Sequence, residues 1–268
     1  MIDFDKLFED YLVSWYAEHE SAFNSVDEME ELVPQIYEEW AASPCPQIGG
    51  IAPRAFFDNI ASPAELIDIL IGTSTGDQNP CSLLMDRIAA VPECAAGLYA
   101  VIDGEYSPKQ KLIAINLLRE TDAPAPLETF VKWLPLAGID GGLKELAVEI
   151  LAENADAVSG LLFPLLEGAD EALKADLAEI LVNAKKDDRT FALLTDLFAS
   201  GYNPPLCAGY LGKYGDERCA PLLYKALDDC GYLEYIEIKN AIERLGGVVD
   251  DTRDFSSDEY YAAIKNLR

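Results

Sequence analysis

The sequence predicts an all-α protein in which pairs of short helices repeat along much of the chain. Apolar residues recur with helical spacing almost everywhere, whereas the alternation typical of strands is almost absent. Similar apolar segments return at nearly regular intervals along the last two-thirds of the chain. Half of the 268 residues are hydrophobic. A chain of this length and composition can bury a large core without help from metals or disulfides.

Two helices are expected at the start of the chain. Aromatic side chains at i, i+4, i+7 and i+11 would share one face of a helix from about Asp3 to Glu20. These residues are Phe4, Phe8, Tyr11 and Trp15. A second helix is expected from about Val26 to Ala42, with a bend at Pro34.

Two stretches rich in glycine and proline are expected to be loops. One covers residues 43–53, where Pro53 should begin the next helix because proline suits the first helical position. The other covers residues 72–80, where Asn79 should cap the following helix. The second loop superficially resembles a phosphate-binding loop. It lacks the Lys-Ser/Thr ending and a preceding strand, so we reject that interpretation.

From about residue 97 the chain repeats itself. Similar apolar segments begin at Phe130, Leu161, Ala192 and Pro221, which are almost evenly spaced. Helices with their own apolar stripe are expected between these segments. A period of about 30 residues, built from two short helices, is typical of a helical solenoid. Each pair has an apolar face that only its neighbours can bury, so the pairs must stack.

Residues 211–229 carry a resemblance to a known repeat. Their sequence, LGKYGDERCAPLLYKALDD, is similar to a HEAT-like repeat boundary, in which L-G-x-x-G-D precedes P-x-L-x-x-L-x-D. The pattern is most similar to the short HEAT-like repeats named after phycobilisome lyases, within the armadillo/HEAT superfamily. The resemblance covers about residues 96–248 and implies a right-handed α-α superhelix. Residues 1–95 are then an N-terminal helical region, made of either degenerate repeats or a separate cap.

The chain departs from the HEAT pattern at one basic position. HEAT repeats usually place an arginine early in the second helix, paired with an aspartate in the preceding turn. Here Lys111, Lys144 and Lys174 occupy that place, and Pro204 and Ile238 stand there in the last two repeats. We therefore expect only a partial ladder of ion pairs, with these lysines in a structural or solvated role.

The repeats are expected to end at Gly246-Gly247, because glycine is typical of the residue after a helix. Residues 249–268 should then form a C-terminal capping helix. Its helical part should run from about Ser257 to Leu267, capped by residues 254–259.

The chain is strongly acidic, with 48 acidic residues, 20 basic residues and a formal net charge of −28. Such a surface repels nucleic-acid phosphates and anionic membranes, so neither is an expected partner. It would attract a basic protein or peptide. The alternative is that the acidity serves solubility alone.

A cytoplasmic location is expected. No signal peptide or membrane-spanning apolar run is recognisable. The six cysteines contain no C-x-x-C pair and lie mostly among apolar residues, as expected of buried, reduced thiols.

The sequence offers no catalytic motif, and we expect no metal and no cofactor. His19 is the single histidine and lies between Glu18 and Glu20, at what should be a solvated helix end. A catalytic role for it is therefore not expected. No calcium-binding loop and no arginine-rich phosphate clamp are present. Binding is favoured over catalysis.

The favoured function is an acidic helical-repeat scaffold or adaptor that binds a basic protein or peptide on its concave face. The expected contact residues are Glu145, Glu149 and Glu179, with Tyr210 and Tyr214 nearby. The alternative is a lyase-like enzyme with a pocket between the N-terminal helices and the solenoid. A third hypothesis assigns the contacts to exposed aromatic residues of the N-terminal helices. The oligomeric state is left open.

Overall fold

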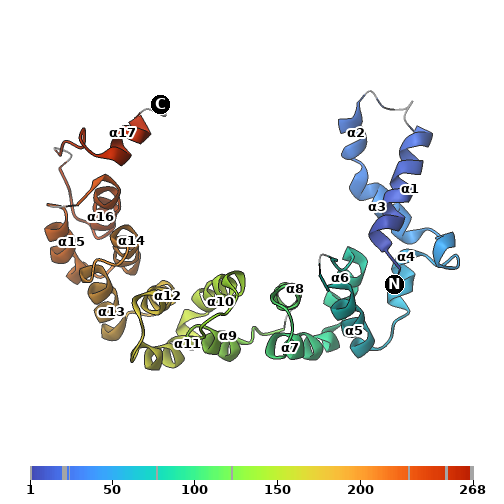
Figure 1. The fold of residues 1–268 in the computed structure, drawn as a ribbon, viewed down its shortest axis with the longest axis horizontal. Helices are drawn as coiled ribbons and strands as arrows, with labels where there is room; N and C mark the ends of the chain where they lie inside the picture. The colour runs from blue at the N-terminus through green and yellow to red at the C-terminus, as the bar shows by residue number, and fades with distance from the viewer. Residues whose placement is uncertain are drawn as a thin grey trace. The chain divides into compact units, whose positions relative to one another are not determined.

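The computed structural model describes residues 2–19, 23, 25–76, 78–121, 123–228, 230–250 and 253–265. Within these residues the protein is all-α, as predicted: the chain forms the helices α1 to α17 and no strand (Figure 1). The chain divides into two compact units, residues 1–125 and 126–268. The boundaries at 95/96 and 248/249 mark where the repeat pattern is visible in the sequence, and they remain predictions.

The first helices of residues 1–125 differ in one respect from the prediction. Helix α1 (Phe4–His19) lies where it was expected. The single helix expected from Val26 to Ala42 is wrong, because α2 (Val26–Glu30) and α3 (Val33–Ala42) are separate. Pro34 lies in the first turn of α3, where its missing N–H leaves no helical hydrogen bond unmade. The proline starts a helix instead of bending one.

Of the two helix starts predicted after the glycine- and proline-rich loops, one is confirmed and the other is wrong. Helix α4 (Pro53–Asp58) begins at Pro53, as predicted. The cap predicted at Asn79 is wrong, because α6 (Ser82–Ala89) begins after Cys81 and has no side-chain cap. The helix begins two residues later than the Asn79-Pro80 pair indicated, so the Asn79 side chain caps no helix. The remaining elements of this unit are η2 (Pro46–Ile48), α5 (Pro63–Thr73), η3 (Pro92–Cys94), α7 (Ala95–Asp103) and α8 (Pro108–Arg119).

Aromatic rings form much of the core at the start of this unit. The ring of Phe4 lies 5.3 Å from that of Phe56 and 4.8 Å from that of Phe57. Phe8 packs between Tyr37 and Trp40, at 4.9 and 5.2 Å. Ring pairs at such distances add to the stabilisation from apolar burial. The aromatic face of α1 thus holds it against α3 and α4.

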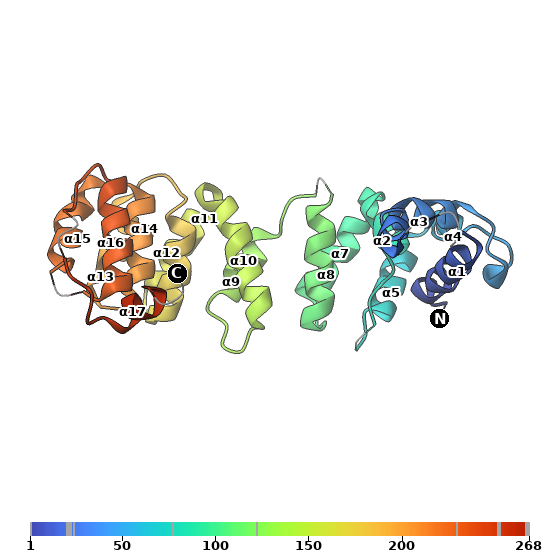
Figure 2. The ribbon, with the colours of Figure 1, turned by 90° about the horizontal axis from the view of Figure 1, so that it is seen from above.

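Residues 126–268 form pairs of helices. The first members are α9 (Leu127–Trp133), α11 (Ala155–Leu162), α13 (Asp188–Ala199) and α15 (Ala220–Ala226). The second members are α10 (Gly141–Glu153), α12 (Glu171–Leu181), α14 (Pro204–Tyr214) and α16 (Tyr232–Arg244). Successive second members contact one another, and Figures 1 and 2 show them side by side. We call these four helices the second-helix row. Two short helices, η4 (Phe163–Leu166) and η5 (Glu217–Cys219), lie at the junctions.

Aspartates fix where two of the second helices, α10 and α12, begin. The Asp140 carboxylate accepts a hydrogen bond from the backbone N–H of Leu143, at 3.1 Å. At the equivalent place in the next repeat Asp170 accepts one from Leu173, at 2.8 Å. Each bond satisfies one N–H group that the helix itself leaves without a partner. The spacing of these caps therefore sets the same start for successive repeats.

Two glycines of the L-G-x-x-G-D motif have distinct roles. A Cβ atom at Gly212 would lie 2.8 Å from the Ala241 Cα atom, so this glycine lets α14 and α16 approach closely. Gly215 has φ +67 and ends α14 in the left-handed region, which glycine enters without strain. The motif thus shapes both the packing of α14 and its end.

The chain ends much as predicted. Gly246 has φ +83, and the N–H of Gly247 donates to the Ile242 carbonyl at 2.9 Å, which terminates α16. Helix α17 (Glu259–Lys265) begins after Asp258 and contacts α16. The last residue predicted for it, Leu267, lies outside the described residues. Among the helices that the structure describes, none combines the length and apolar character that a membrane crossing requires.

Candidate functional site

A polar depression of about 460 Å³ lies on the second-helix row. The three glutamates predicted to bind a partner all line it, and helices α10, α12 and α14 contribute to its walls. We call it the acidic depression. Its lining consists of Glu145, Glu149, Ala152, Glu153, Glu179, Asn183 and Lys213. The structure therefore brings together Glu145, Glu149 and Glu179 from two successive repeats.

Helical spacing explains why these carboxylates share one surface. Glu145, Glu149 and Glu153 follow one another at i, i+4 and i+8 on α10, so they lie above one another on the same face. The apolar residues between them, such as Ala147 and Leu151, are fully buried on the other side. Contact between α10 and α12 then brings Glu179 beside this stripe. The carboxylates face outward because burying the apolar stripe leaves them no other orientation.

The charge of the acidic depression falls along the row. Glu153, Asn183 and Lys213 are evenly spaced in the chain and hold equivalent places in three successive repeats. Glu149 and Glu179 have the same spacing, and the next position in their series is Gly209. The surface is therefore most acidic over α10 and carries a lysine over α14. In total, four carboxylates face one ammonium group.

The two predicted tyrosines are buried and have different roles. Tyr210 is 8% exposed, and its hydroxyl donates to the Glu179 carboxylate at 3.2 Å. Burial, and then the charge of Glu179, raise the pKa of Tyr210, so its hydroxyl stays protonated and holds Glu179 in place. Tyr214 is 4% exposed, and its hydroxyl donates to the Asp187 carbonyl at 2.9 Å. Tyr214 is a packing residue and does not form part of the contact surface.

Of the lysines at the expected basic position, Lys144 forms an ion pair between repeats and Lys111 bonds to a carbonyl, so the predicted partial ladder is not established. Lys144 pairs with Asp176 at 2.5 Å and so joins α10 to α12 beside the acidic depression. Its partner lies in the next repeat and not in the preceding turn. Lys111 donates to the Ile102 carbonyl at 2.7 Å and caps the end of α7. Burial lowers the pKa of Lys111. Both lysines are structural.

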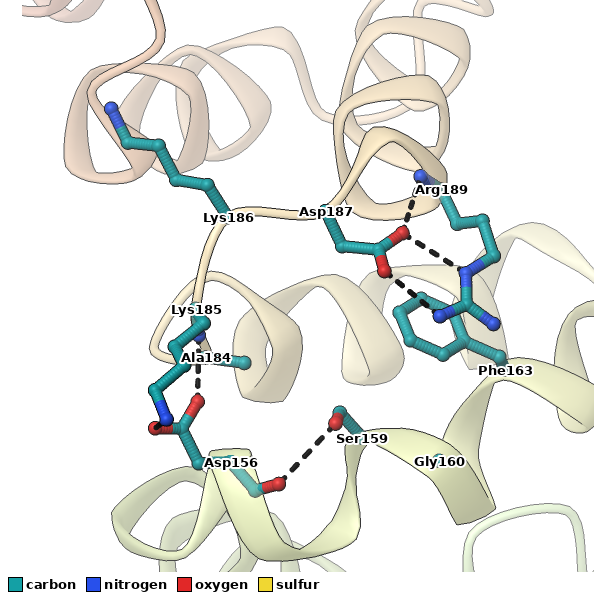
Figure 3. A pocket seen from close by; sticks show the side chains of 9 residues that line it. All are labelled: Asp156, Ser159, Gly160, Phe163, Ala184, Lys185, Lys186, Asp187 and Arg189. Atoms are coloured by element: carbon teal, nitrogen blue, oxygen red, sulfur yellow. Dashed lines mark hydrogen bonds and ion pairs between the residues drawn. The ribbon is translucent and has the colours of Figure 1, made fainter.

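A smaller pocket of about 210 Å³ gathers three bases that the sequence analysis did not single out (Figure 3). Arg189 donates to both carboxylate oxygens of Asp187, at 2.9 and 2.8 Å, and lies 3.7 Å above the Phe163 ring. The Arg189 guanidinium lowers the pKa of Asp187 to about 2. Lys186 points away from the pocket and donates to the Gly215 carbonyl at 2.6 Å. Lys185 pairs with Asp156 at 3.7 Å.

The same arrangement returns in the next repeat. Arg218 pairs with Asp216 at 2.8 Å and lies 4.1 Å from the centre of the Phe191 ring. It also reaches Asp188 of the preceding repeat at 2.9 Å. We call each set of aspartate, arginine and ring an arginine clamp. Its sequence signal is Asp-x-Arg at residues 187–189 and 216–218. The bases of the smaller pocket already have partners within the protein, and its lining comes from two successive repeats. We therefore interpret this pocket as a junction between repeats.

His19 lies at the C-terminal end of α1. Its ring stacks on Trp15 at 4.1 Å, and its Nδ1 atom donates to the Trp15 carbonyl at 2.8 Å. Within the described residues, no cluster of three or more histidine, cysteine or carboxylate side chains has the arrangement of a metal site.

Comparison with known proteins adds no further constraint. No family model, curated protein or solved structure matches this chain. The chemistry of its own surface is therefore what indicates a function.

Proposed function

We propose that this chain is a HEAT-like α-solenoid that acts as a scaffold or adaptor and binds a basic segment of a protein or peptide. The observation that carries the proposal is the convergence of Glu145, Glu149 and Glu179 on the acidic depression. The nearly equal spacing of the helix caps and of the arginine clamps supports the solenoid arrangement. The six free cysteines fit a location in the reducing cytoplasm.

An extended basic segment suits this surface because the carboxylates are exposed and spread over several turns. An exposed ion pair contributes only about 0–1 kcal/mol, so binding would need several pairs at once. Screening by salt would weaken them together. The net charge of −28 would also accelerate the approach of a basic partner.

The decrease in negative charge along the second-helix row indicates where the basic residues of the partner would bind. Its basic residues should lie over α10 and α12, where Glu149, Glu153 and Glu179 gather. Lys213 marks the limit of the acidic surface over α14. A partner whose positive charges end opposite Lys213 is expected to bind better than one whose charges continue past it.

The test is the affinity of a fluorescent peptide of alternating lysine and alanine, measured by anisotropy. We expect Glu145→Lys, Glu149→Lys and Glu179→Lys, combined, to weaken binding roughly 10- to 100-fold, since three attractive pairs become repulsive. Lys213→Glu should strengthen binding. Raising the salt concentration should weaken binding to the wild type steeply.

A matched variant separates the site from net charge. Glu167→Lys, Asp196→Lys and Glu217→Lys, combined, change the charge of the same unit equally at positions outside the acidic depression. Equal weakening by the two triple variants would overturn the assignment of the site, because total charge alone would then explain binding. Circular dichroism and urea unfolding confirm that each variant is folded.

A further inference from the structure

An apolar pocket of about 570 Å³ lies within residues 1–125, between the first turns of α1 and helices α4, α5 and α6. Pockets of this size commonly hold one small molecule. Its apolar walls are Phe4, Phe56, Phe57, Ile69 and Leu84. Three of these side chains are almost fully buried, with Phe4 6%, Phe57 3% and Leu84 1% exposed. They are held by the core, so these walls exist before any ligand binds.

The rim of the apolar pocket on α1 carries an excess of negative charge. Asp3, Asp5 and Glu9 line it together with one base, Lys6. Lys6 is already paired with Asp10 at 2.9 Å and with Glu9 at 3.7 Å. Asp3 accepts the backbone N–H of Lys6 at 2.9 Å and so caps α1.

Asp5 differs from the other two carboxylates. Within the residues that the structure describes, it has neither an ion pair nor a hydrogen bond. Partial desolvation, and then the charges of Asp3 and Glu9, raise the pKa of Asp5. Asp5 is exposed at the rim, so its carboxylate is accessible to a ligand in the pocket. The pocket therefore offers an apolar interior beside one unpaired carboxylate.

The side of the apolar pocket formed by the loop between α5 and α6 presents amide groups. Gln78 and Asn79 line the pocket from the loop between α5 and α6. Lys109 donates to the carbonyls of Gly76 at 3.0 Å and of Gln78 at 2.7 Å, which fixes this loop in position. The amide oxygens of Gln78 and Asn79 are potential acceptors for further N–H donors of a ligand.

We propose that this pocket binds a small organic cation, a primary ammonium ion that carries an aromatic or branched aliphatic body. The body would fill the space between the phenylalanine rings, and the ammonium group would donate to Asp5. The phenylalanine faces would also attract the cation. An anionic ligand would meet the carboxylates of the rim. The site lies in a different unit from the acidic depression and does not depend on it.

The test compares three probes with the same body and different charges: phenylbutylammonium, phenylbutanol and phenylbutyrate. Isothermal titration calorimetry at low salt gives their affinities for the full chain. We expect the ammonium ion to bind at least about tenfold more tightly than the alcohol, and the carboxylate to bind least. Equal affinities for the three probes, or no binding of the ammonium ion at millimolar concentration, would overturn the proposal.

Three variants locate the binding site. Asp5→Asn should reduce the affinity for the ammonium ion to that for the alcohol, whereas Glu18→Gln, at the other end of α1, should leave it unchanged. Ile69→Trp fills the pocket and should prevent all binding while the protein stays folded by circular dichroism. If the Glu145, Glu149 and Glu179 variant removes ammonium binding, the probe binds in the acidic depression and the pocket is excluded as its site.

Discussion

In residues 1–125 the aromatic rings around α1 pack on one another. Residues 126–268 also contain ring pairs, such as Phe130–Trp133 and Tyr235–Phe255, but two of their rings lie instead beneath arginines of the following repeat. Phe4 and Phe8 contact four other rings from α3 and α4. Phe163 and Phe191 lie under Arg189 and Arg218. Ring-on-ring packing depends on irregular local shapes and leaves a pocket beside α1. The arginine clamp occurs at two successive junctions and closes both in the same way.

The charges follow the same division. Acidic residues outnumber basic ones by 22 to 6 in residues 1–125 and by 26 to 14 in residues 126–268. The additional bases of the second unit include Arg189, Arg218 and Lys144, which connect neighbouring repeats. The second unit thus uses several of its bases in its own assembly.

The largest effect should come from a glycine that lets two helices approach closely in each unit. Gly212→Ala would place a Cβ atom 2.8 Å from the backbone of α16, so we expect a loss of roughly 1–3 kcal/mol in the free energy of unfolding. Gly97→Ala, in the first unit, meets the side chain of Ile67 at 2.6 Å, which can adjust in part, and should cost less. Urea unfolding measures both.

Gly209 is the control on the same helix as Gly212. A Cβ atom there would have no neighbour within 4 Å, and Ala is the better helix former. Gly209→Ala should therefore stabilise the protein by roughly 0.5–1 kcal/mol. If Gly212→Ala stabilises the protein as Gly209→Ala does, α14 and α16 do not approach each other as closely as the structure shows.

Alkaline pH should destabilise the protein through three thiols whose pKa is strongly raised, two in the second unit and one in the first. Burial raises the pKa of Cys207, Cys219 and Cys81 from 9.0 to about 11. A raised pKa means that the fold favours the neutral thiol. Stability is therefore complete below pH 9.0 and falls as the pH rises towards about 11. A pKa raised from 9.0 to about 11 corresponds to a loss of roughly 3 kcal/mol per thiol at most.

Urea unfolding at a series of pH values measures this loss. In Cys207→Ala the free energy of unfolding should fall less steeply with pH, because one of the three thiols no longer contributes. This difference in slope is independent of the effect of the substitution at neutral pH. An unchanged decline in that variant would show that Cys207 already ionises freely in the folded protein.

The smallest effect concerns the arginine clamp itself. A double-mutant cycle with Arg189→Met and Phe163→Leu should give a coupling free energy of about 0.5–1 kcal/mol, as expected for an exposed cation over a ring. The control cycle pairs Arg218→Met with Phe163→Leu, since Arg218 lies over Phe191. Equal coupling free energies in the two cycles would show that Arg189 has no specific interaction with the Phe163 ring.

The sequence predicted what depends on periodicity. The all-α class, the start of α4 at Pro53 and the end of α16 at Gly246 follow from local patterns. The gathering of Glu145, Glu149 and Glu179 was predictable because equivalent positions of successive repeats meet at one surface. These features need only the helical period and the length of the repeat.

Features that depend on distant packing were missed. Tyr214 was expected at a contact surface, but its ring is buried and its hydroxyl bonds to Asp187. The apolar pocket arises where α1 meets α4, α5 and α6, and no spacing in the sequence indicates that meeting. The arginine clamp could have been found, because Asp-x-Arg recurs at residues 187–189 and 216–218.

Arg218 holds the first residue of α13, Asp188, as well as its own Asp216. When the turn that carries Arg218 comes loose, Asp188 loses its counter-charge, and fraying of α13 leaves Arg218 with a single partner. Local opening at residues 187–199 and at residues 216–226 is therefore linked, even though the two helices are separate elements. Because α14 also packs against both α13 and α16, the last repeats of the chain should open together and not helix by helix.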